Sequence, residues 1–229
     1  MRKFRWTTSG GAAGVAYVVV AIVAATLNGK PPAWDATNKA IQSFLIDHRD
    51  SVVAQGWLYA LASSLILWFA VVVRHVLYTA SNGKRSGDLF LASIAVVAAL
   101  SFVSMSIRIV TAAAADQLSA SAVRTVGYDF SLALLSLQGF IVAAAAVAYA
   151  ACVISEPVLP TWTAWLAILA AIINVAGTAS VFFRTGVFSI EGNLLTSWLP
   201  VLITAIWYLA VSVALIRTRD GAGPAVGSG

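Results

Sequence analysis

The sequence predicts an all-α integral membrane protein, a bundle of six transmembrane helices with a short amphipathic helix between the first two. Two observations lead to this fold class. Of the 229 residues, 60% are hydrophobic and only 10% are charged, and the mean hydropathy is +0.89, whereas a soluble domain is about 25% charged. The charges are also clustered. They leave windows free of Asp, Glu, Lys and Arg at residues 6–29, 51–73, 89–107, 130–155, 157–183 and 192–216.

These windows have the length of membrane spans. A helix of roughly 20 apolar residues crosses the hydrocarbon core, and only a helix satisfies its own backbone hydrogen bonds there. The third window reaches that length comfortably only if Arg108 lies within the span. We expect one domain at 1–219 and a disordered tail at 220–229. The expected spans are about 10–28, 52–74, 89–114, 130–153, 162–183 and 195–216.

The first window has the basic start of a signal peptide, MRKFR. Its apolar stretch is longer than the roughly 7–15 residues of a signal sequence, and ATLNGKPP is a poor cleavage site, so we expect a retained helix. Orientation follows from Lys and Arg, which concentrate in cytoplasmic segments. With the N-terminus inside, eight of the 14 lie on the inner side, five on the outer side and Arg108 within a span. Both termini are therefore predicted to be cytoplasmic.

The connection after the first span carries the predicted amphipathic helix. The stretch PPAWDATNKAIQSFLIDHRDS opens with two prolines and then offers Asp35 or Thr37 as an N-cap. Its apolar side recurs at i, i+3, i+4 and i+7, at Ile41, Phe44, Leu45 and His48. This helix either lies on the outer membrane surface or caps the bundle.

Composition and motifs argue against several classes of function. In a membrane protein the net charge of +5 reflects topology, so no nucleic-acid partner is expected. Cys152 is the single cysteine, which excludes an intrachain disulfide and a multi-thiolate metal site. No P-loop, HExxH, CxxC or nucleophile-elbow motif occurs, so we predict no metal and no cofactor. Asp47, His48 and Asp50 lie close enough in sequence to serve an acid–base enzyme, and a solvated helix face is the alternative.

Arg108 is the most unusual residue, because it lies in the third span about 12 Å before Asp116 at about 1.5 Å per residue. An ionisable group in a span is a functional hypothesis by default; the alternative is a side chain that snorkels to the outer headgroups. Ser101, Ser104 and Arg108 form a polar stripe on one helix face, which favours the bundle interior. Asp129, at the outer start of the fourth span, is the predicted ion-pair partner.

Two carboxamides lie at similar depth in the next two spans. Gln138 is about 13 Å from Asp129, and Asn174 is about 15 Å from Arg184. Asn174 also shares a helix face with Thr178. A hydrogen bond between Gln138 and Asn174 is one interpretation, and a shared ligand site is the other.

Together these groups predict an amphipathic cavity that opens outward and binds or transports a small amphipathic or anionic molecule, such as a lipid. The predicted ligand-binding residues are Ser104, Arg108, Asp129, Gln138, Asn174 and Thr178. The expected partners are the lipid bilayer and this small amphipathic ligand or lipid. Two other classes of function stay open: a non-catalytic accessory subunit with a membrane-protein partner in the cell envelope, and a membrane-embedded enzyme.

The sequence also resembles a known family. The features that carry the resemblance are WDATNKAIQSFLIDHRD after the first span, Trp68 and Phe69, GVFS after the fifth span, and Trp207, Ser212, Leu215 and Arg217. This pattern resembles the six-span, mostly actinobacterial membrane proteins grouped as domain of unknown function 4386. The resemblance implies a six-helix protein of a bacterial plasma membrane, and it brings no activity, ligand or catalytic residue.

Overall fold

The fold is described from a computed structural model, which covers residues 5–29, 32, 35–182 and 198–217. Over these residues the structure has no strand, and six of its helices are long and apolar enough to cross a membrane. The predicted all-α six-helix fold is therefore confirmed, whereas the predicted tail at 220–229 lies outside the described residues. The elements are α1 (Trp6–Thr26), α2 (Asn38–Asp47), α3 (Arg49–Leu77), α4 (Gly83–Ala113), α5 (Ala120–Ala122), η1 (Val123–Phe130), α6 (Ser131–Ser155), α7 (Thr161–Thr178), η2 (Ala179–Phe182) and α8 (Leu199–Arg217).

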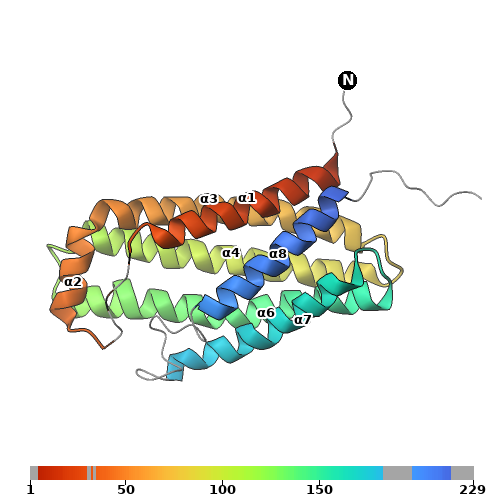
Figure 1. The fold of residues 1–229 in the computed structure, drawn as a ribbon. Helices are drawn as coiled ribbons and strands as arrows, with labels where there is room; N and C mark the ends of the chain where they lie inside the picture. The colour runs from red at the N-terminus through yellow and green to blue at the C-terminus, as the bar shows by residue number, and fades with distance from the viewer. Residues whose placement is uncertain (1–4, 30–31, 33–34, 183–197, 218–229) are drawn as a thin grey trace, which may run out of the picture.

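The six long helices form a closed ring. Each packs against its neighbours in the order α1, α3, α4, α6, α7 and α8, and α8 packs against α1. Short connections at 78–82 and 156–160 make consecutive helices antiparallel. Figure 1 shows α2 lying across one end of the bundle, while the start of α1 and the end of α8 lie at the other. We call these the α2 end and the turn end, the latter after the two short turns that lie there.

Glycines let α1 approach its neighbours closely. A Cβ atom on Gly10 would overlap the side chain of Val72 on α3, and one on Gly14 would lie 2.6 Å from the ring of Phe69. A Cβ atom on Gly11 would lie 2.5 Å from the backbone oxygen of Ser212 on α8. The small-residue face of α1 is thus occupied by contacts within the chain.

Aromatic side chains fill the bundle from the turn end to its middle. The ring of Trp207 lies 5.6 Å from Tyr149, 6.3 Å from Phe90 and 4.9 Å from Tyr208, measured between centroids. Tyr208 in turn contacts two further rings, on α1 and α3. These rings come from five helices, so they tie most of the bundle together. We call them the aromatic core: Tyr17, Phe69, Phe90, Tyr149, Trp207 and Tyr208.

Candidate functional site

Helix α2 caps the bundle and does not lie in the membrane surface. Thr37 is its N-cap, and its hydroxyl accepts a hydrogen bond from the backbone N–H of Ala40 at 3.2 Å. Ile41 and Leu45 on its apolar face are fully buried. Leu45 packs into a small apolar cluster with residues of α3, α4 and η1. The apolar face of α2 is therefore covered by protein, which decides between the two predicted placements.

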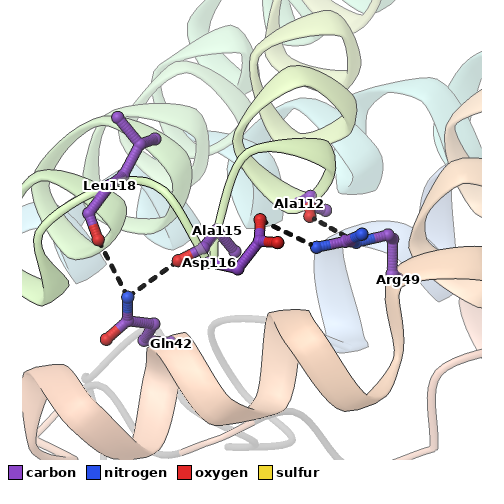
Figure 2. Close-up of polar contacts among 6 residues, drawn as sticks. All are labelled: Gln42, Arg49, Ala112, Ala115, Asp116 and Leu118. Atoms are coloured by element: carbon purple, nitrogen blue, oxygen red, sulfur yellow. Dashed lines mark hydrogen bonds and ion pairs between the residues drawn. The ribbon is translucent and has the colours of Figure 1, made fainter.

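Two polar side chains fasten this cap to the end of α4 (Figure 2). The amide of Gln42 donates to the carbonyls of Ala115 at 2.7 Å and Leu118 at 2.9 Å. Arg49, at the start of α3, donates to the carbonyl of Ala112 at 3.1 Å and pairs with Asp116 at 3.0 Å. The last carbonyls of a helix lack partners within it, so these side chains satisfy groups that would otherwise need water.

The segment η1 joins the cap to the fourth span, and it is a π-helix. In a π-helix residues five apart are neighbours, and such segments occur often at functional sites. Accordingly, the guanidinium of Arg124 lies 3.4 Å from the carboxylate of Asp129. Arg124 also donates to the carbonyl of Ala36 at 2.5 Å, and the hydroxyl of Tyr128 donates to the carbonyl of Pro32. Both contacts hold the chain that leads into α2.

Below the cap, the bundle interior is polar. The amide of Asn28 donates to the side chain of Gln55 at 2.8 Å, which links the end of α1 to α3. The hydroxyl of Ser104 on α4 donates to the carbonyl of Ser131 on α6 at 2.9 Å. We call this region the polar interior, and we assign to it Asn28, Gln55, Tyr59, Ser104, Arg108, Tyr128 and Ser131.

Arg108 lies in this polar interior and has no hydrogen-bond or ion-pair partner among the described residues. Its Nε atom is fully buried, and its guanidinium forms no hydrogen bond or ion pair with any described residue. Tyr59 on α3 and Tyr128 on η1 are titratable groups within electrostatic range of it. The Cα–Cβ bond of a helical residue tilts toward the N-terminus of its helix, which for α4 is the turn end. The side chain of Arg108 therefore starts toward the turn end, and its Nε atom is covered by protein.

The predicted ion pair between Arg108 and Asp129 is not formed. Asp129 pairs with Arg124, and its Oδ1 atom is buried without a donor. The reason is the π-helix: on an α-helix residues five apart point about 140° apart, whereas the wider turn of η1 brings Arg124 and Asp129 onto one face. Sequence periodicity alone gives no sign of this local change.

The predicted hydrogen bond between Gln138 and Asn174 is also absent. Gln138 accepts from Ser101 on α4 at 3.3 Å, and Asn174 donates to Thr204 on α8 at 2.8 Å and to a carbonyl of its own helix. Their similar depth is nevertheless real, because a Cβ atom on Gly139 would lie 2.8 Å from the backbone oxygen of Asn174. The side chain of Gln138 on α6 faces α4, whereas the side chain of Asn174 on α7 faces α8.

Thr178 contributes no polar contact to a shared site, because its hydroxyl donates to the carbonyl of Val175 in its own helix at 2.6 Å. The structure thus brings Ser104 and Arg108 together in the polar interior. Asp129 lies at its edge, Gln138 adjoins it through Ser101, and Asn174 and Thr178 belong to a separate contact between α6, α7 and α8.

Two hollows on the described surface lie at the α2 end, and neither is lined by Arg108. One, of about 650 Å³, is open and polar, and it is lined by Ile46, Asp47, His48, Arg49, Asp50, Ser51 and Asp116. The ring of His48 stacks on Phe44, and the Ser51 hydroxyl donates to the backbone carbonyl of His48 and not to its ring. No group of three His, Cys, Asp or Glu side chains in the described chain is arranged to hold a metal ion. The hollow therefore has the residues of an acid–base site without a nucleophile–base pair.

Sequence reasoning missed Tyr59, Tyr128 and the Asn28–Gln55 pair. Gln55 and Tyr59 are four residues apart and share a face of α3, so their spacing in the sequence indicates a polar stripe along the second span. Tyr128 carried no such signal, because its role depends on the turn of η1 and on the chain before α2.

The sequence matches no family model, and neither a curated protein nor a solved structure matches it. The resemblance to domain of unknown function 4386 therefore stays a prediction, and the function is inferred from the structure.

Proposed function

We propose that this multi-pass membrane protein binds a small anionic amphipathic molecule in the polar interior, with Arg108 as the residue that holds its charge. The observation that carries the proposal is the unpartnered guanidinium. Its Nε atom is buried in a membrane-spanning helix, and the carboxylate expected to neutralise it pairs with Arg124.

An uncompensated charge at this place is energetically costly. Moving an ion from water into a protein interior costs roughly several kcal/mol, even after the protein relaxes around it. A charge within a membrane span carries a similar free-energy cost. An anion bound at Arg108 offsets this cost by forming charge-assisted hydrogen bonds. The neighbouring side chains of Met105 and Ile109 are apolar, which favours a ligand with an apolar part.

We further propose that the turn end faces the cytoplasm of a bacterial cell and that the α2 end faces outward. The basic residues Lys84, Arg85 and Arg217 are exposed at the turn end. The acids there are engaged locally: Asp88 pairs with Arg74 at 2.8 Å, and Glu156 accepts from Ser81. An excess of free basic side chains is typical of the cytoplasmic side. The ligand would then reach the site from the outer leaflet or the outer solution.

The proposal is tested by comparing the anions that co-purify with three forms of the protein. We would extract the wild type, Arg108→Met and Arg49→Met in the same detergent and identify bound lipids and fatty acids by mass spectrometry. Arg49→Met is the matched control, because it removes the same charge from the α2 end at a guanidinium that is already paired.

We expect the wild type and Arg49→Met to retain an anionic species that Arg108→Met loses. An identical set of bound anions in all three proteins would contradict the proposal. A wild type that carries no anion, and whose melting temperature oleate and phosphatidylglycerol do not raise, would contradict it as well, because a ligand that binds only the folded state stabilises it.

A further inference from the structure

We propose that Tyr59 is a ligand-binding residue and that its hydroxyl donates a second hydrogen bond to the anion held by Arg108. The site would therefore recognise an oxyanion, a carboxylate or a phosphate. This inference rests on the proposed function and adds the group that determines which anions fit.

The packing of α3 on α4 places Tyr59 at the right level. A Cβ atom on Gly56 would lie 2.5 Å from the side chain of Ile109 and 3.7 Å from the backbone oxygen of Met105. Tyr59 is three residues, about 4.5 Å, further along α3, and α4 runs in the opposite direction. Tyr59 therefore lies level with the part of α4 toward which the Cα–Cβ bond of Arg108 tilts.

Tyr59 also faces the inside of the bundle. Gln55 and Ser63 lie four residues before and after it, on the same face of α3, and both are buried. Tyr59 itself is partly buried, and its hydroxyl lies within electrostatic range of the Arg108 guanidinium. The two residues lie on adjacent, packed helices, α3 and α4.

The hydroxyl of Tyr59 is available to a ligand. It forms no hydrogen bond with the described residues, whereas the hydroxyl of Tyr128, the other tyrosine near Arg108, donates to the carbonyl of Pro32. A phenol has a single O–H to donate. Of these two tyrosines, Tyr59 is the one whose hydroxyl proton is not donated to a described residue.

A guanidinium and a phenol hydroxyl together favour a ligand with several oxygen acceptors. The guanidinium fork matches two oxygens of a carboxylate or phosphate, and the hydroxyl takes a remaining lone pair. A fatty acid and an anionic phospholipid share this chemistry, so the experiment has to distinguish the two sources.

The test measures ligand binding to protein reconstituted in phosphatidylcholine nanodiscs. Wild type, Tyr59→Phe, Arg108→Gln and Tyr78→Phe would be titrated with oleate, phosphatidylglycerol, inorganic phosphate and, as an uncharged amphiphile, methyl oleate. Tyr78→Phe is the matched control, because it removes the same hydroxyl at the turn end. Thermal unfolding without ligand checks that Tyr59→Phe folds as the wild type does, as expected for a hydroxyl without a partner.

We expect Tyr59→Phe to weaken binding of oleate or phosphatidylglycerol by about tenfold or more, the effect of losing one hydrogen bond to a charged group. Arg108→Gln should abolish that binding, and Tyr78→Phe should leave it unchanged. If the two site variants lose binding of oleate alone, the ligand is a free carboxylate. If they lose binding of phosphatidylglycerol, the ligand is a lipid headgroup. Binding of inorganic phosphate but of neither amphipathic anion would overturn the amphipathic part of the proposal. Binding of methyl oleate as tight as that of oleate would overturn its anionic part.

The two proposals fail in different ways. If Arg108→Gln abolishes binding and Tyr59→Phe leaves it unchanged, the role of Tyr59 is wrong and the anion site stands. If Arg108→Gln leaves binding unchanged, the proposed function itself is wrong.

Discussion

The two halves of this bundle are built from the same helices but are filled in different ways. Toward the turn end, rings from five helices pack against one another around Trp207, which is fully buried. Toward the α2 end, the interior holds amides, hydroxyls and the guanidinium of Arg108. Close packing drives helix association in lipid, where no hydrophobic force acts between helices. The aromatic half therefore accounts for the stability of the fold, and the polar half is free to bind.

The ionisable groups that contain a buried atom without a hydrogen bond lie on one side of this division. Among the described residues, buried side-chain atoms without a partner occur in both halves, including Nε1 of Trp207 and Oγ of Ser212. Those that belong to ionisable groups, Nε of Arg108 and Oδ1 of Asp129, lie toward the α2 end. A buried charge without a partner is costlier than an unpaired neutral dipole, and Arg108 lies in this half, so this half is the one in which a bound ligand offers the larger gain.

The largest effect is expected from opening the aromatic core. Trp207→Ala removes the ring that contacts Phe90, Tyr149 and Tyr208, and we expect it to lower the free energy of unfolding by about 3–5 kcal/mol, the usual cost of a large cavity. Unfolding in mixed micelles with increasing denaturing detergent measures this change. The matched control is Trp57→Ala, because Trp57 is 65% exposed and its ring faces outward. Similar losses for both variants would refute the assignment of stability to the aromatic half.

The next largest effect is a difference in the free energy of unfolding between variants of two arginines toward the α2 end, Arg124 and Arg108. Arg124→Met removes the partner of Asp129 and a donor to the carbonyl of Ala36. Leaving such half-buried acceptors unsatisfied costs about 1 kcal/mol, the lower end of the usual range. Arg108→Met removes no hydrogen bond or ion pair with the described residues and removes a charge whose Nε atom is buried, so the free energy of unfolding of the ligand-free protein should stay the same or rise. The same unfolding assay measures both. A stability loss for Arg108→Met as large as that for Arg124→Met would mean that Arg108 has a structural role.

This pair of arginines also shows how far the sequence predicts the molecule. Six spans follow from the charge-free windows because lipid excludes charge. The exact helix ends do not follow in the same way: α4 begins at Gly83, six residues before the expected span at 89, because a helix continues into the headgroup region past Lys84, Arg85 and Asp88. Arg108 was identified because a single charge stands out in an apolar run.

The partners of the polar residues were not predictable to the same degree. Arg124 and Asp129 meet only because η1 is a π-helix, and Gln138 meets Ser101 only because α6 turns that face to α4. Hydropathy fixes the depth of a residue, and helical periodicity fixes its relative direction, but neither says which neighbouring helix a face will meet. The choice depends on the packing of the whole ring.

A smaller and more local effect is expected at the cap. Gln42→Leu removes two hydrogen bonds, to Ala115 and Leu118, each of which contributes about 1 kcal/mol. We expect faster hydrogen exchange in α2 and the 114–118 turn, with no change around Trp207. Ser43→Ala is the control in the same helix, because Ser43 is exposed and forms no hydrogen bond with a described residue. Faster exchange throughout the bundle would show that the two halves do not open independently.

The smallest effect should appear at the turn end, where polar groups are satisfied. Glu156 accepts hydrogen bonds from the backbone N–H of Ser81 at 2.8 Å and from its hydroxyl at 2.7 Å, and these bonds hold the pKa of the Glu156 carboxyl below its usual value. Because the folded-state pKa is lowered, the contact stabilises the fold above the unfolded-state pKa of about 4.3 and is lost as the pH falls through the lowered value.

The chemical shift of the Ser81 amide, followed by NMR during an acid titration, reports this loss. We expect its midpoint below about 4.3 in the wild type and no titration of this amide in Glu156→Gln, which keeps an oxygen acceptor without the charge. A midpoint at or above the usual glutamate value would mean that the bonds between the two turns are weaker than the structure indicates. The turn end would then lack the satisfied polar contacts that distinguish it from the half that contains Arg108.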